Sequence, residues 1–153
     1  MVGACPHRLP ALIGALLFVM TALAACATSA PANAVETIAA SVLVEPSADR
    51  AQWYRDVEVP EGTDGYELLV AATDGQVEAE YFPEFRSHLV GSVLDVSPQG
   101  EEFWGVFLWN EQAGVWEPLV YGADWFSVKD GHVMAWALVE YSPDTLQLPV
   151  SVP

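Results

Sequence analysis

Short segments of alternating apolar and polar residues dominate the chain after residue 40. In residues 53–59, Val57 and Val59 fall on one face of an extended chain. Asp56 and Glu58 fall on the other. This period of two predicts a half-exposed strand of an antiparallel sheet. Other segments with strand-like composition are 40–45, 77–81, 87–96, 103–109, 115–117 and 133–141.

Two of these segments are apolar on both faces, which predicts central strands that are covered on both sides. The first is 133–141. In the second, 103–109, the two faces carry Phe103, Phe107 and Trp109 on one side, and Trp104, Val106 and Leu108 on the other. Residues 110–114 then turn the chain into a predicted hairpin. Gly91 interrupts 87–96 and predicts a β-bulge or a close approach of another backbone.

One short helix is predicted between the second and third strands. Asp64 and Glu67 have the spacing of a capping box, and Asp74-Gly75 ends the helix. About two turns of helix are not stable alone, so this helix is expected to pack on a sheet. The chain is therefore predicted to form an α+β domain that is mainly β. It has antiparallel sheet of about seven strands and one short helix near its start.

The N-terminal segment has a different pattern. An apolar run from Leu9 to Ala22 follows Arg8 and leads into Leu23-Ala24-Ala25-Cys26. The run is too short for an ordinary spanning helix and resembles a signal peptide that ends in a bacterial lipobox. Cys26 is then the lipidated N-terminal residue of the exported protein. The alternative is a secretory signal cleaved at Ala32-Asn33-Ala34, which leaves a soluble secreted protein.

These patterns divide the chain into four predicted segments. They are a signal peptide (1–25), a flexible tether (26–41), a folded domain (42–141) and an irregular tail (142–153). The expected location is the cell membrane or cell envelope, facing outside the cytoplasm. The lipid anchor is expected to be the only attachment to the membrane.

Charge and cysteine content narrow the possible functions. The chain has 21 Asp and Glu against 5 Lys and Arg, a net charge of −16. Such a surface repels phosphates, so no nucleic-acid partner is expected. The two cysteines are Cys5 and Cys26, so the folded part has no thiol for a disulfide, a metal cluster or a nucleophile. No cofactor and no metal are expected.

The sequence offers little support for catalysis. It contains neither G-x-S-x-G nor H-E-x-x-H. Ser87 and His88 are neighbours on a predicted strand, so their side chains are expected on opposite faces. His88 and His132 are interpreted as structural or surface residues. The protein is predicted not to be an enzyme.

The tryptophans are the strongest candidates for function. Trp104 and Trp136 lie on the segments that are apolar on both faces and are expected in the core. Trp109, Trp116 and Trp125 lie near strand ends and turns, where an indole is expected to stay half exposed. Flat aromatic surfaces suit a planar ligand or a sugar. Packing in the core is the alternative role for these three.

A series of landmarks runs in order along residues 42–141. They are Val57-Glu-Val-Pro-Glu-Gly62, Gly65-Tyr-Glu-Leu-Leu69, Phe103-Trp104, Gly122-Ala123-Asp124, Lys129-Asp130-Gly131 and Trp136. This order resembles the transcobalamin-like C-terminal domain family. His132 departs from the pattern, because the family often carries an acidic residue after the glycine.

The resemblance implies a β-rich module that binds a corrinoid or another small planar ligand and passes it to a transporter or surface protein. Trp109, Trp116 and Trp125 would form the ligand surface, with Asn110 and Asp124 as polar contacts. Animal carriers hold the corrinoid between this domain and a helical domain, which residues 42–141 do not include, so only weak corrinoid affinity is expected. The alternative is a structural or adhesive module that recognises another protein through a sheet edge or an aromatic patch.

Overall fold

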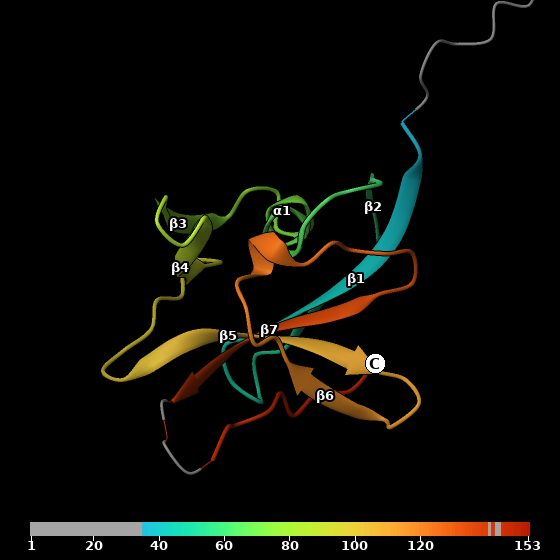
Figure 1. Cartoon of the computed structure of the whole chain (residues 1–153). Coiled ribbons are helices and arrows are strands. Elements are labelled where there is room, and N and C mark those ends of the chain that lie inside the picture. The colour runs from blue at the N-terminus through green and yellow to red at the C-terminus, as the bar shows by residue number, and fades with distance from the viewer. Residues whose placement is uncertain (1–34, 141, 143–144) are drawn as a thin grey trace, which may run out of the picture. The chain divides into compact units, whose positions relative to one another are not determined.

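The computed structural model describes residues 35–140, 142 and 145–153. Two sheets and one α-helix make up this part of the chain (Figure 1). The elements are β1 (Thr37–Glu45), β2 (Gln52–Pro60), α1 (Gly65–Ala72), β3 (Val77–Phe82), β4 (Ser87–Val93), β5 (Glu102–Asn110), β6 (Val115–Pro118), the 3₁₀ turn η1 (Ala123–Trp125) and β7 (Val133–Glu140). Among the described residues, no helix has the length and apolar character needed to cross a membrane.

The larger sheet has five strands in the order β2-β1-β7-β5-β6, and β3 and β4 form a separate hairpin. All neighbouring pairs are antiparallel except β1 and β7, which run parallel. The mainly β fold with one early helix is confirmed. The sheet is mixed rather than wholly antiparallel, because the last strand inserts between β1 and β5. That long-range pairing places the doubly apolar strands β5 and β7 inside the sheet, as predicted.

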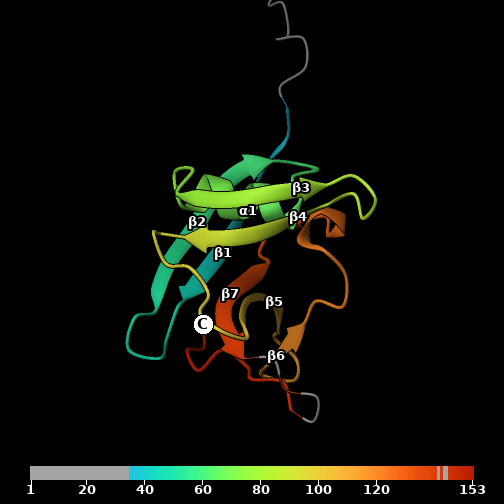
Figure 2. The same cartoon turned by 90° about the vertical axis from the view of Figure 1, so that its left-hand side faces the viewer.

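Both faces of the five-stranded sheet are covered. On one face, α1 and the β3–β4 hairpin pack over a core that includes Val42, Leu68, Trp104 and Trp136. In Figure 2 the hairpin lies in front of α1. The opposite face carries a second cluster of buried residues: Leu43, Phe107, Trp116, Ala135, Ala137 and Val139.

Local signals in the sequence explain the helix and the hairpin. Asp64 and Glu67 form the predicted capping box, with the Asp64 carboxylate accepting from the Glu67 N–H at 2.8 Å. Gly65 allows α1 to approach β7, because a Cβ there would lie 2.8 Å from Met134 Cε. In the hairpin, Glu78 pairs with Ser92 and Ala79 with Val90. Gly91 is the extra residue between them, so the predicted bulge is confirmed.

The folded region extends beyond both predicted boundaries. β1 begins at Thr37, so residues 37–41 belong to the sheet and not to the predicted tether. Small residues here resemble a linker in composition, but Ile38 and Ala40 pair with Val59 and Val57 of β2. Cys26 and the lipobox lie outside the described residues.

The described part of the tail (142 and 145–153) contains no helix or strand. It nevertheless packs on the sheet. The buried Glu45 carboxylate accepts from the N–H groups of Val150 at 2.7 Å and Ser151 at 2.9 Å. The tail is therefore part of the fold, and the predicted domain end at residue 141 is too early.

Candidate functional site

The aromatic residues predicted for ligand binding do not form one surface. Trp109 and Trp116 meet edge to face, with ring centroids 5.1 Å apart. Trp116 is only 4 % exposed, so the prediction of a half-exposed indole is wrong there. The tail covers it, and its Nε1–H donates to the Ser151 carbonyl at 2.8 Å. Trp109 stays half-buried.

Asn110 shapes the β5–β6 turn. Its Nδ2 donates to Glu117 at 2.7 Å, and its Oδ1 accepts from the Ala113 N–H at 3.0 Å. Trp109 and Asn110 line a cavity of about 410 Å³ beside His132. The amide is already engaged within the hairpin, which gives Asn110 a structural role.

Asp124 and Trp125 lie on η1 and contact the β3–β4 hairpin instead. Trp125 is 54 % exposed, and its Nε1–H donates to the Phe85 carbonyl at 3.2 Å. The Arg86 guanidinium lies over its ring, 4.9 Å from the centroid. Of the three predicted ligand-binding tryptophans, Trp125 is therefore the most exposed, and it belongs to a different part of the molecule from Trp109.

Asp124 fixes the start of β4. Its carboxylate accepts from the Ser87 hydroxyl at 3.0 Å, from the His88 N–H at 3.0 Å and from His88 Nδ1. The expectation that Ser87 and His88 diverge is wrong, because both side chains converge on this carboxylate where the strand begins. Since Ser87 donates to Asp124 and not to His88, the three residues do not form a relay that would activate the hydroxyl.

Electrostatics and packing reinforce this connection. Burial alone would raise the pKa of Asp124, but the hydrogen bonds from the His88 backbone, the His88 ring and Ser87 outweigh it and lower the pKa. The His88 ring also stacks on Tyr66 of α1, with centroids 3.9 Å apart. A Cβ at Gly122 would lie 2.2 Å from Ser87 Oγ, so a larger residue there would displace the Ser87 hydroxyl. The hairpin is thus attached to both η1 and α1.

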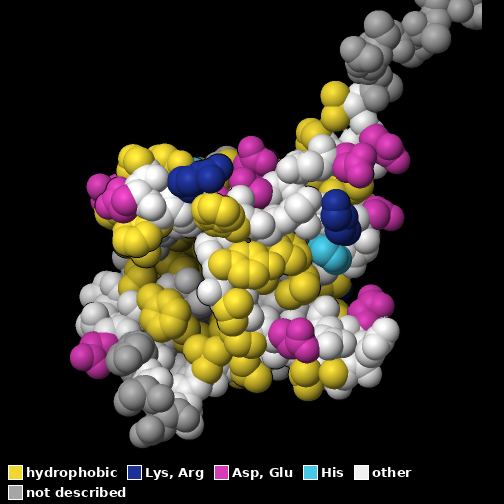
Figure 3. All heavy atoms as spheres, viewed as in Figure 1, with side chains coloured by type: hydrophobic (Ala, Val, Ile, Leu, Met, Phe, Trp, Pro, Cys, Tyr) yellow, Lys and Arg dark blue, Asp and Glu magenta, His cyan; other side chains and the backbone are white. Residues whose placement is uncertain are grey.

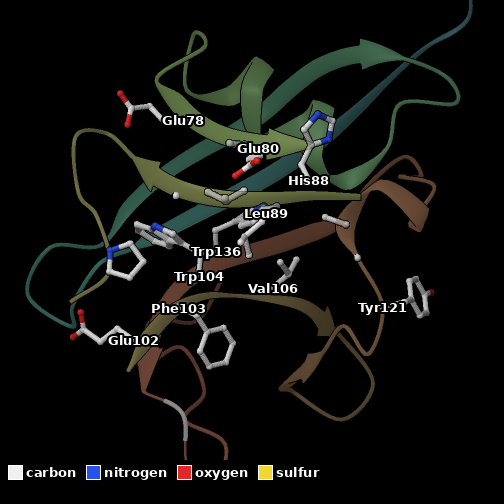
Figure 4. Close-up of a pocket in the computed structure, with 16 residues that line it drawn as sticks. Glu78, Glu80, His88, Leu89, Glu102, Phe103, Trp104, Val106, Tyr121 and Trp136 are labelled. Atoms are coloured by element: carbon white, nitrogen blue, oxygen red, sulfur yellow. The ribbon is translucent and has the colours of Figure 1, made fainter. Parts of the chain in front are cut away.

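A cleft of about 710 Å³ lies between β4 and the five-stranded sheet (Figure 4). Leu89 of β4, Phe103 of β5 and Tyr121 line it and are 61 %, 39 % and 52 % exposed. The buried indoles of Trp104 and Trp136 complete the apolar wall. Figure 3 shows apolar side chains around a hollow on this face of the molecule. The volume is within the range of small-molecule sites.

Two indole N–H groups on the tryptophans that line this cleft have no hydrogen-bond partner among the described residues. The Nε1–H groups of Trp104 and Trp136 are buried, and neither finds a hydrogen-bond acceptor among the described residues. Trp104 is 6 % exposed and Trp136 is 3 % exposed. A buried donor without an acceptor costs about 1–3 kcal/mol, and most native proteins contain few of them.

Acidic side chains predominate among the titratable groups that line the cleft, which also include His88, paired with Asp124. Glu78 and Glu80 of β3 and Glu102 of β5 contribute carboxylates, and no lysine or arginine lines it. Within the described ranges, no group of three or more His, Cys, Asp or Glu residues is arranged to hold a metal ion.

Comparison with known proteins identifies structures of the same fold, but no family to which the chain belongs. No protein-family profile and no curated protein matches the chain. Solved structures share its fold, among them the two that follow. Haptocorrin in complex with Cbi superposes with a TM-score of 0.58 at 15 % identity, over 74 % of this chain and 28 % of the haptocorrin chain. A candidate metal-binding protein from Ruminococcus gnavus superposes with a TM-score of 0.53 at 16 % identity, over 69 % of this chain and 99 % of that protein.

The sequence did not predict that the cleft residues would form a binding site, for identifiable reasons. Leu89 and Tyr121 lie in segments without distinctive motifs, and Phe103 was assigned to a strand face. Trp104 and Trp136 were correctly predicted to be buried, but their patterns gave no sign that their N–H groups would lack acceptors. An aromatic residue directly before the Gly122 turn, Tyr121, was the available signal.

Proposed function

We propose that the protein is a non-enzymatic, exported binding module that holds a small planar ligand in the cleft between β4 and the five-stranded sheet. The single observation that carries this proposal is a 710 Å³ apolar cleft lined by two tryptophans whose buried indole N–H groups have no partner among the described residues. Apolar walls supply affinity, and a few fixed polar groups orient the ligand. The site thus differs from the hairpin surface around Trp109 and Trp116.

A corrinoid is the proposed ligand class. The fold is shared with haptocorrin, whose structure was determined with Cbi, and the order of landmarks along the sequence supports the same class. Because the chain corresponds to 28 % of haptocorrin, weak affinity is expected for this module alone. Transfer of the ligand to a transporter or a surface protein is part of the proposal.

Titration with Cbi while the tryptophan fluorescence is recorded tests the binding. Ligand in the cleft should change the emission of Trp104 and Trp136. Leu89→Gln combined with Phe103→Gln should weaken binding at least about tenfold, since each side chain contributes about 1–2 kcal/mol of apolar contact. Val115→Gln on β6, where Val115 is 45 % exposed, is the matched control and should bind like the parent. An equal loss of Cbi affinity in the cleft variant and the control, or no binding of Cbi by the parent, would refute the cleft as the binding site.

We also propose that acylation of Cys26 anchors the protein outside the cytoplasm. The run Leu23-Ala24-Ala25-Cys26 supports it. Cys26→Ala should move the protein from the membrane fraction to the soluble fraction or stall its processing, whereas Cys5→Ala should not. A Cys26→Ala variant that fractionates and migrates like the parent would rule out the lipid anchor.

Recognition of another protein is the second candidate function. Apolar residues beside the cleft remain exposed, including Phe85 (69 %), Val120 (87 %) and Trp125 (54 %). If Phe85→Ser and Trp125→Ser abolish binding to a surface partner while Cbi titration gives no signal, this alternative replaces the ligand-binding proposal.

A further inference from the structure

Acidic side chains border the apolar wall of the cleft. Glu80 of β3 is directly opposite Leu89 of β4, so the two side chains share a face of the hairpin. Figure 4 shows Glu80 beside Leu89, and Glu78 and Glu102 farther out at the edge of the lining. Among the described residues, neither Glu78 nor Glu80 forms an ion pair. Their negative charge is therefore not neutralised locally.

The indole N–H groups of Trp104 and Trp136 favour electronegative atoms, whereas the glutamates repel negative charge. An indole N–H is a donor only, so a ligand group that reaches the buried N–H of Trp104 or Trp136 must be a hydrogen-bond acceptor. A neutral carbonyl oxygen satisfies this requirement. An anionic oxygen would also accept, but the three glutamates would repel it.

We infer that the cleft selects flat apolar ligands whose polar groups are neutral acceptors, such as amide carbonyls, and discriminates against ligands that carry negative charge. This inference rests on the proposed function, because it takes the cleft as the binding site. Three carboxylates within about 8 Å of an anionic group lower its affinity roughly tenfold in water at low ionic strength. Added salt screens this effect.

Two fluorescent probes with the same ring skeleton test the inference. N-phenyl-1-naphthylamine is neutral, and 8-anilinonaphthalene-1-sulfonate carries a sulfonate. The measured quantity is the ratio of their dissociation constants for the purified protein, at low and at high NaCl concentration. Competition with Cbi establishes that the probes occupy the cleft.

Charge variants separate the effect of the cleft glutamates from that of the net charge of the chain. Glu78→Gln combined with Glu80→Gln should improve sulfonate binding about fivefold relative to the neutral probe, and high salt should reduce the change. Glu58→Gln combined with Glu61→Gln changes the net charge equally, on exposed positions outside the cleft lining. This control pair should leave the ratio of dissociation constants almost unchanged.

The possible failures are distinguishable. If both probes compete with Cbi but the Glu78/Glu80 pair leaves their ratio unchanged, the inference is wrong and the proposed function stands. An equal response to both pairs of substitutions would also overturn the inference, because the net charge of the chain would then be the cause. If Cbi binds but neither probe competes with it, the inference is overturned and the proposed function stands. If Cbi itself does not bind, the proposed function fails and the inference fails with it.

Discussion

The two faces of the five-stranded sheet use tryptophan in different ways. On the face covered by the tail, Trp116 is 4 % exposed, and its N–H reaches the Ser151 carbonyl at 2.8 Å. On the face toward the hairpin, Trp136 is equally buried at 3 % exposed, but its N–H has no acceptor in the described chain. The first indole is surrounded by protein. The second borders a cleft of about 710 Å³.

This difference separates a structural residue from a ligand-binding candidate where burial alone does not. A buried indole with a satisfied N–H is explained by packing and one hydrogen bond. Two neighbouring indoles with unsatisfied N–H groups, both bordering an apolar cleft, are better explained by a ligand that supplies the acceptors. The comparison therefore gives both faces a structural role and supports the proposal that the hairpin face also binds a ligand.

The largest expected effect is loss of stability on either face. Trp116→Ala and Trp136→Ala should each lower the free energy of unfolding by about 3–5 kcal/mol, because each removes a large buried side chain. Urea denaturation measures the change, and Val120→Ala at an exposed position is the control. A loss below about 1 kcal/mol at either tryptophan would contradict its assigned burial.

Smaller substitutions sharpen the comparison. Trp116→Phe removes a satisfied donor and leaves the Ser151 carbonyl without it, whereas Trp136→Phe removes a donor that has no acceptor. Both changes delete similar volume. Trp116→Phe should therefore cost about 1 kcal/mol more in the free energy of unfolding. Equal losses, or a larger loss for Trp136→Phe, would remove the distinction between the two faces.

The smallest expected effect concerns the attachment of the hairpin. The pKa of Asp124 is below its ordinary value of 3.8 in the folded protein. Its carboxylate therefore stabilises the fold above the unfolded pKa, and this contribution is lost as pH falls through the folded pKa. Asp124→Asn should cost about 1 kcal/mol at neutral pH, and the difference from the parent should vanish in acid. Glu58→Gln, which removes one carboxylate charge at an exposed position, is the control.

A difference in the free energy of unfolding that stays constant from neutral to acid pH would contradict this account of Asp124. The same outcome would mean that hydrogen-bond geometry, and not the carboxylate charge, holds Ser87 and His88 in place.

Local sequence patterns predicted much of the fold. The two-sided apolar segments predicted that β5 and β7 lie inside the sheet, the spacing of Asp64 and Glu67 predicted the helix start, and Gly91 predicted the bulge. These features depend on residues close together in sequence. The parallel pairing of β1 with β7 was missed, because strand partners across the whole chain leave no local pattern.

The candidate site was less predictable for the same reason. Trp116 was expected to be half exposed because it follows a turn, but the tail that covers it lies 35 residues away. The contact of His88 with Asp124 spans 36 residues. The cleft brings together β4, β5 and the segment after β6, and only the fold shows that Leu89, Phe103 and Tyr121 share it.

The most direct test of the central claim is a two-dimensional ¹H–¹⁵N spectrum of the six indole N–H groups during titration with Cbi. Substitution of single tryptophans by phenylalanine assigns the resonances. The account predicts that the resonances of Trp104 and Trp136 shift as they gain an acceptor, while that of Trp116 stays in place. Shifts confined to Trp109 and Trp125, or an unchanged spectrum at saturating Cbi, would contradict ligand binding in the cleft.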